Sequence, residues 1–205
     1  MGSRPVVIVL AAGQGARFAG WQCQPSLSLG VSHVLGTTLR QALASQFRVV
    51  VVADRLLRDL VGDHVATRDI VLLQGGERVS MGQAMAAGVA ACSDATGWLM
   101  LPADMPMVEP ITLQQVARPL DMHSIVCAHY RGRRGHPIGF AAELYTELVT
   151  LKDDDGVRRL MARYPSLAVE VDDPGVLLDS DPGIEAAVRA RAPIEAQSVS
   201  VPPLA

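Results

Sequence analysis

Short runs of consecutive apolar residues limit what this chain can fold into. The first run, from Val6 to Leu10, contains no polar residue, which is typical of a strand buried on both faces of a sheet. Similar runs follow at residues 49–53, 70–73, 98–101 and 124–128. A shorter alternating run at 169–171 suits an edge strand. The pattern therefore predicts a sheet whose inner strands are covered on both sides.

Segments with helical patterning lie between these runs. Leu35, Leu39, Leu43 and Phe47 recur at four-residue spacing, and Pro110 suits the first turn of a helix. Further helices are expected at residues 81–92, 111–116, 142–151, 156–163 and 184–191. Alternation of strands and helices predicts an α/β three-layer sandwich with a Rossmann-like, mostly parallel sheet. We interpret residues 4–192 as a single domain and residues 193–205 as a loose C-terminal tail.

Composition argues against several classes of protein. The chain is 49% hydrophobic, which supplies a core, and its net charge of −3 disfavours nucleic acid held by bulk electrostatics. No apolar stretch reaches the length of a membrane span. Cys23, Cys92 and Cys127 form no CxxC pair, so neither a disulfide framework nor a zinc knuckle is expected. We therefore expect a soluble cytoplasmic protein that binds neither nucleic acid nor membrane.

A glycine-rich segment, LAAGQGARF, follows the first strand. Small residues let the backbone amides approach an anion, and Arg17 adds positive charge. The segment is not a dinucleotide fingerprint, because Phe18 stands where GxGxxG requires glycine, and it is not a P-loop. It predicts either an anion-binding loop or a tight turn with a surface arginine.

Carboxylates follow the fourth strand and recur late in the chain. Asp104, in LPADMP, is held between two prolines just past a buried strand, where ligands bind in sheets of this kind. Mg²⁺ prefers one or two such carboxylates together with phosphate oxygens, although a lone aspartate can also cap a turn. Asp179 and Asp181, in LLDSDP, offer a second metal ligand, a turn cap or a helix cap.

A third motif, RGHPIGF, contains His136 and follows a basic run that includes Arg134. Glycine and proline on either side of His136 predict an accessible loop. The histidine then either binds an anionic or polar acceptor or has only a surface role.

In this order, these motifs resemble the MobA-like nucleotidyltransferases, and most closely the molybdenum cofactor cytidylyltransferases. The resemblance covers roughly residues 5 to 190 and implies a fold of the nucleotide-diphospho-sugar transferase type. It implies transfer of CMP from CTP (or of GMP from GTP) to the phosphate of molybdopterin or molybdenum cofactor, with Mg²⁺ and release of pyrophosphate.

The resemblance also assigns roles to residues. Arg17 and Asp104 would act in catalysis, Asp104 with Asp179 or Asp181 would bind the metal, and His136 and Arg134 would bind the acceptor. The nucleotide-binding residues would be Leu10, Ala11, Ala12, Gly13, Gly15, Arg17, Gln24, Ser80 and Gly82.

One feature of the family is missing. The family has a lysine six to ten residues past the loop arginine, but here no lysine or arginine lies between Arg17 and Arg40, and Gln22 or Gln24 takes its place. Of the 18 cationic residues, 17 are arginine, and the one lysine is Lys152. Either another cation substitutes, or the protein is a weakened nucleotide- or cofactor-binding module that delivers to a molybdoenzyme. A nucleotidyltransferase for another small phosphate is the third alternative.

Overall fold

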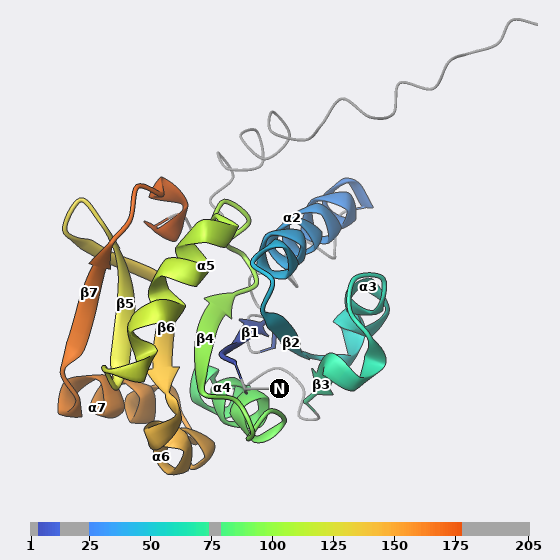
Figure 1. Ribbon diagram of the computed structural model, residues 1–205. Coiled ribbons are helices and arrows are strands. Elements are labelled where there is room, and N and C mark those ends of the chain that lie inside the picture. Colours follow the sequence, from blue (N-terminus) through green and yellow to red (C-terminus); the bar gives the residue numbers. More distant parts are fainter. Residues whose placement is uncertain (1–3, 13–24, 74–78, 178–205) are drawn as a thin grey trace, which may run out of the picture.

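The computed structural model describes residues 4–12, 25–73 and 79–177, except for the side chains of residues 25–33. Within these residues, strands pair in one sheet in the order β3-β2-β1-β4-β6-β5-β7 (Figure 1). The strands are β1 (Val6–Leu10), β2 (Arg48–Ala53), β3 (Ile70–Leu72), β4 (Gly97–Pro102), β5 (Ile125–Tyr130), β6 (Arg133–Ala141) and β7 (Ser166–Glu170). Neighbouring strands are parallel except where β6 pairs with β4 and β5.

Helices cover both faces of this sheet. The α-helices are α2 (Pro25–Ala44), α3 (Arg58–Gly62), α4 (Met81–Ala90), α5 (Pro110–Ala117), α6 (Tyr145–Val149) and α7 (Asp154–Arg163). Short 3₁₀ turns are η1 (Arg55–Leu57), η2 (Thr67–Asp69), η4 (Arg118–Asp121), η5 (Ala142–Leu144) and η6 (Pro174–Leu177). Figure 1 shows α2 and α5 on one side of the sheet and α4, α6 and α7 gathered on the other.

The alternation of side chains along β1 explains the two helical layers. Val7 and Val9 join a buried cluster with residues of α2, α3 and α5. Ile8 and Leu10 join a second cluster with residues of α4, α6 and α7. Because every residue of β1 is buried, both faces need covering, and the predicted three-layer sandwich with a mostly parallel sheet is confirmed.

The predicted positions of β1 to β4 are confirmed to within one residue, and β5 ends two residues later than predicted, at Tyr130. The predicted edge strand at 169–171 begins earlier, at Ser166, although Val171 still donates a backbone hydrogen bond to His129 (2.9 Å). The predicted helix at 142–151 is instead the turn η5 followed by α6. The expected helix at 184–191 and the tail at 193–205 lie outside the described residues.

The expectation that His136 lies on a loop is wrong, because His136 belongs to β6. The paired residues shift from Cys127 with Ile138 to His129 with Arg134, so three residues of β6 lie opposite one of β5. His136 is the middle residue of this bulge. Gly135 lies so close to η6 that a Cβ on it would come within 2.1 Å of the Val176 carbonyl oxygen. Glycine serves close packing here, which the sequence pattern cannot distinguish from a turn.

Candidate functional site

The carboxyl ends of β1 and β4 lie side by side, since Leu10 pairs with Pro102. Beyond the strands, the Ala103 amide donates to the Leu10 carbonyl (3.1 Å). The Thr38 hydroxyl of α2 donates to the Ala103 carbonyl (2.9 Å). These bonds fix the turn that carries Asp104, whose exposed fraction is only 2%. The predicted metal ligand therefore lies at the edge of the sheet where ligands bind in this class of fold.

The chemistry of Asp104 fits a hard divalent cation, because its carboxylate offers the oxygen ligands that Mg²⁺ prefers. Over residues 4–12, 25–73 and 79–177, no three histidines, cysteines, aspartates or glutamates gather closely enough to hold a metal. Asp179 and Asp181, the predicted second ligands, lie outside the described residues.

Only the first part of the glycine-rich loop lies within the described residues. The amides of Ala11 and Ala12 both donate to the Val52 carbonyl of β2, at 2.8 and 2.9 Å. These two amides serve the fold, so an anion-binding nest would have to come from the residues after Ala12. Gly13, Gly15, Arg17, Gln22 and Gln24 lie in the part of the chain that the structure does not describe.

Ser80 is the N-cap residue of α4 and forms a capping box with Gln83, with hydrogen bonds of 3.0 and 3.1 Å. The Ser80 hydroxyl also donates to the Lys152 carbonyl (3.1 Å). The Asp154 carboxylate accepts hydrogen bonds from the amides of Met81 (2.8 Å) and Gly82 (3.4 Å). The beginning of α4 is thus bound to the connection between α6 and α7. The Ser80 hydroxyl and the Gly82 amide thus already have partners within the chain. The nucleotide contacts predicted for these two residues stay predictions.

Gly82 has a steric role in the same contact. A Cβ on Gly82 would lie 2.3 Å from the Asp153 carbonyl oxygen, which no side chain could tolerate without movement of the backbone. This contact joins segments about seventy residues apart and was not predicted from the sequence. Its only signal was the acidic run after Lys152, which can be satisfied by a helix N-terminus as well as by water.

The predicted acceptor residues, Arg134 and His136, lie on β6 where the β5–β6 hairpin approaches the carboxyl edge. Arg134 pairs across the hairpin with His129, a neighbour that sequence reasoning missed. Burial raises the pKa of the Cys127 thiol, and the positive charge of Arg134 lowers it in part. Arg134 brings positive charge to this end of the sheet, and binding of an acceptor stays a prediction.

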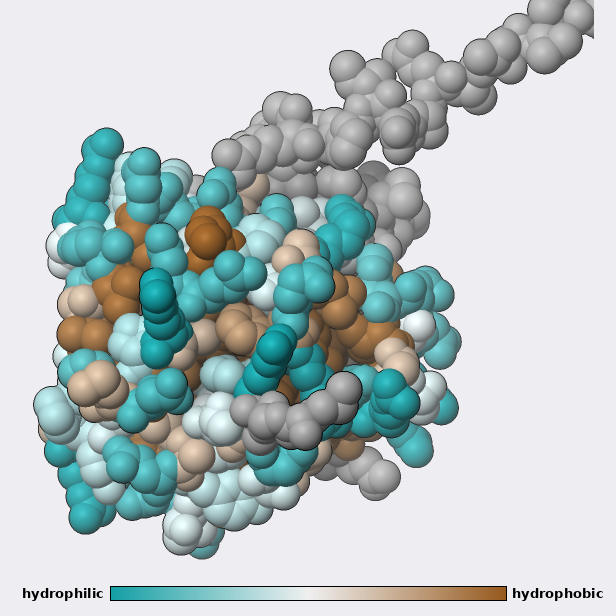
Figure 2. Space-filling model, viewed as in Figure 1, coloured by the Kyte–Doolittle hydropathy of each residue, from teal (hydrophilic) through white to brown (hydrophobic). Residues whose placement is uncertain are grey.

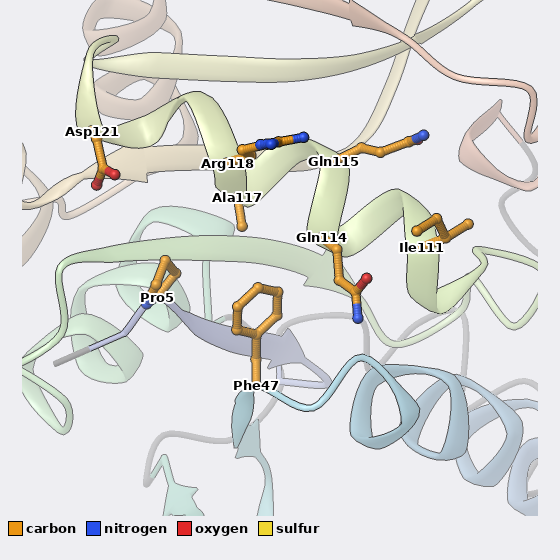
Figure 3. A pocket seen from close by; sticks show the side chains of 8 residues that line it. All are labelled: Pro5, Phe47, Ile111, Gln114, Gln115, Ala117, Arg118 and Asp121. Carbon is orange, nitrogen blue, oxygen red and sulfur yellow. The ribbon is translucent and has the colours of Figure 1, made fainter. Parts of the chain in front are cut away.

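The described residues line two cavities at the surface of the protein. One, of about 450 Å³, lies at the amino-terminal edge, because Pro5 and Phe47 precede β1 and β2 (Figure 3). The other, of about 510 Å³, lies between α3 and the edge strand β3. On the face shown in Figure 2, apolar side chains reach the surface in separate patches among polar ones. Neither cavity includes Asp104, so neither is the predicted site.

The chain matches the family model of the MobA-like NTP transferase domain over residues 7–169. This match covers most of the sequence, and the chain belongs to that family. Its sheet and helices have the Rossmann-like arrangement of nucleotide-diphospho-sugar transferases. No helix in the described ranges is both long enough and apolar enough to cross a membrane.

Solved structures of other proteins share this fold. The Rv0371c protein of Mycobacterium tuberculosis H37Rv is 26% identical, with a TM-score of 0.70 over 91% of this chain and 97% of that one. A complex of Rv0371c with manganese is 24% identical, with a TM-score of 0.69 over the same shares. A 4-diphosphocytidyl-2C-methyl-D-erythritol synthase from Anaerococcus prevotii DSM 20548 is 13% identical, with a TM-score of 0.67 over 93% and 98%. No curated protein sequence matches this chain.

Proposed function

We propose that this protein transfers CMP from CTP to the phosphate of molybdopterin or a molybdenum-loaded form of it, and releases pyrophosphate. The observation that carries the proposal is the buried Asp104 carboxylate, held beside the end of β1 where the LAAGQGAR segment begins. Membership of the MobA-like family supports nucleotidyl transfer. The choice of CTP and of a pterin acceptor comes from the motif resemblance.

In this reaction, an oxygen of the acceptor phosphate forms a bond to the α-phosphorus of CTP. The bond from that phosphorus to the bridging oxygen breaks, and pyrophosphate leaves with its electron pair. The protein has little covalent work to do, so positioning and neutralisation of charge supply the rate. His136 and Arg134 would hold the acceptor phosphate, and Arg17 would bind the triphosphate.

Asp104 would hold the divalent cation, with Asp179 or Asp181 as a second ligand. A bound Mg²⁺ supplies neutralisation of phosphate charge and makes the α-phosphorus more electrophilic. Crystallisation of Rv0371c with manganese supports a divalent metal in a protein of this fold. Hydrogen bonds at Ala103 hold the backbone of the turn that carries Asp104.

The test is pyrophosphate release from CTP, GTP or ATP, each with and without molybdopterin, in the presence of Mg²⁺. Release that needs both CTP and the pterin supports the proposal, and release with GTP would correct the base. Asp104→Ala should abolish the activity, whereas Asp172→Ala, at an exposed aspartate, should not. Equal turnover by wild type and Asp104→Ala would contradict the metal assignment.

A binding or delivery module is the second candidate, and the absence of lysine and arginine between Arg17 and Arg40 favours it. It predicts that CTP or the pterin binds with no pyrophosphate release under any condition. Release with a different phosphorylated acceptor, such as a sugar phosphate, would instead support the third alternative.

A further inference from the structure

The position of Lys152 follows from the direction of α4. This helix returns the chain from the end of β3 to the start of β4, so it runs antiparallel to these strands and begins at the carboxyl edge. Gly88 of α4 packs closely on the side chains of Ile8 and Val52. From Gly88 back to Met81 the helix rises about 10 Å, which equals about three residues of a strand. The beginning of α4 therefore lies beyond the end of β1, level with the loop after Leu10.

Lys152 is attached to this end of α4. Its carbonyl oxygen accepts a hydrogen bond from the Ser80 hydroxyl. The next two residues also contact α4, since the Asp153 backbone packs closely against Gly82 and the Asp154 carboxylate accepts a hydrogen bond from the first amide of the helix. The lysine is exposed, and its flexible stem carries a compact positive charge. The only lysine in the sequence thus lies at the ligand edge, although it is more than a hundred residues from the glycine-rich loop.

The three aspartates after Lys152 have other partners. Asp153 accepts from the Gly156 amide (2.6 Å), Asp154 accepts from the α4 amides, and Asp155 pairs with Arg158 (2.5 Å). Within the residues described here, no carboxylate forms an ion pair with Lys152. The acidic run therefore fixes the backbone around Lys152 and leaves the ammonium group available to a ligand.

We propose that Lys152 binds the phosphates of the nucleotide and supplies the positive charge that the loop after Arg17 lacks. This inference rests on the proposed nucleotidyl transfer. Lys152 is better placed than the arginines of the β5–β6 hairpin, because α4 packs on β1 whereas β5 is separated from β1 by β4 and β6. In this protein, the connection between α6 and α7 would supply the positive charge that related proteins have in the glycine-rich loop.

The test compares Lys152→Met with Lys152→Arg, and uses Arg68→Met as a matched control for loss of one exposed cation on a distant turn. Loss of a charge-assisted phosphate contact should weaken binding of CTP with Mg²⁺ about 10- to 100-fold in Lys152→Met. Lys152→Arg should retain most of the affinity, and Arg68→Met should change it little. Calorimetric titration measures all three, and the melting temperature should stay unchanged because Lys152 contacts Ser80 through its backbone.

A second measurement uses the single lysine. Wild-type protein is lightly acetylated with acetic anhydride, and modification of Lys152 is quantified by mass spectrometry of the peptide that contains it. CTP with Mg²⁺ should protect Lys152, whereas cytidine at the same concentration, which has no phosphate, should not.

The outcomes separate the two proposals. If wild type binds CTP and releases pyrophosphate but Lys152→Met is unaffected, or CTP gives no protection, the role of Lys152 is overturned and the proposed function stands. If wild type does not bind CTP at all, both are overturned. Weaker binding in Lys152→Met that Lys152→Arg does not restore would also contradict a role based on charge.

Discussion

Asp104 and Asp173 are buried to the same extent, with 2% of each residue exposed, but they serve different parts of the molecule. Asp173 accepts hydrogen bonds from the Glu109 amide (2.8 Å), the Thr112 hydroxyl (2.7 Å) and the Gly175 amide (2.9 Å). The Asp173 carboxylate thus caps the beginning of α5, although it lies more than sixty residues away in the sequence. Asp104 lies at the beginning of the connection from β4 to α5, at the carboxyl edge of the sheet.

Burial alone therefore does not distinguish a carboxylate that holds the fold together from one that could bind a ligand. A buried charge is costly unless hydrogen bonds or opposite charges compensate for its lost hydration. The fold supplies that compensation to Asp173 through α5 and η6. Asp104 lies instead at the carboxyl edge of the sheet, where we propose that it holds a divalent cation, so the two residues should respond differently to mutation.

The largest expected effect is on catalysis at Asp104. Asp104→Asn should reduce pyrophosphate release about 10²- to 10³-fold. A neutral amide holds a divalent cation less well than a carboxylate does, so the positive charge that stabilises the developing negative charge would be lost. The variant's free energy of unfolding should change little, since the amide has nearly the same shape. Urea denaturation and turnover measured on the same sample check both points, and a stability loss as large as that of Asp173→Ala would remove the contrast.

Asp173→Ala should lower the free energy of unfolding by roughly 3 kcal/mol, because it leaves buried donors at the start of α5 without an acceptor. The neighbouring Asp172→Ala is the matched control, and it should change stability by less than about 0.5 kcal/mol because Asp172 is exposed. Equal stability of the two variants in urea would show that the Asp173 hydrogen bonds do not hold this connection.

Gly82→Ala extends the comparison to the contact between α4 and Asp153. The added methyl group should overpack this contact and cost about 2 kcal/mol. Gly62→Ala is the control, because a Cβ at this helical position meets nothing within 4 Å. It should stabilise the protein slightly, since alanine favours a helix more than glycine does. Thermal unfolding distinguishes the two, and a neutral Gly82→Ala would show that Asp153 can move away.

The smallest expected effect concerns the loop itself. Gln24→Lys should change wild-type turnover little if Lys152 already supplies the charge, but should raise turnover in the Lys152→Met background. Kinetics of the double-mutant cycle measure this coupling. A larger gain in wild type than in Lys152→Met would mean that the two positions do not substitute for one another.

Prediction from sequence worked best where local patterns agree with the tertiary structure. Runs such as Val6–Leu10 are buried on both faces, and no other element suits five consecutive apolar residues as well. It failed at β6, where glycine and proline resembled a loop although pairing with β4 and β5 forms a strand. The bulge at His136 depends on how β6 pairs with β5 and on the close contact with η6, which is distant in sequence.

The candidate site divides in the same way. The position of Asp104 could be predicted because it directly follows a buried strand, and in such folds ligands bind beyond the strand ends. Its role as a metal ligand stays a prediction. Asp173 could not, because its partners come from α5, and nothing near Asp173 in the sequence distinguishes it from Asp172. A cytoplasmic location, binding of the pterin and the roles of Asp179 and Asp181 stay predictions.

Residue type and spacing along the chain were enough to predict the alternation of strands and helices, the family, and the absence of lysine from the loop. The pairing of His129 with Arg134, and the position of Lys152 beside the first turn of α4, depend on the three-dimensional fold. Such contacts join segments through space, and they depend on the order of strands and the direction of each crossover. Spacing along the chain does not specify either of these.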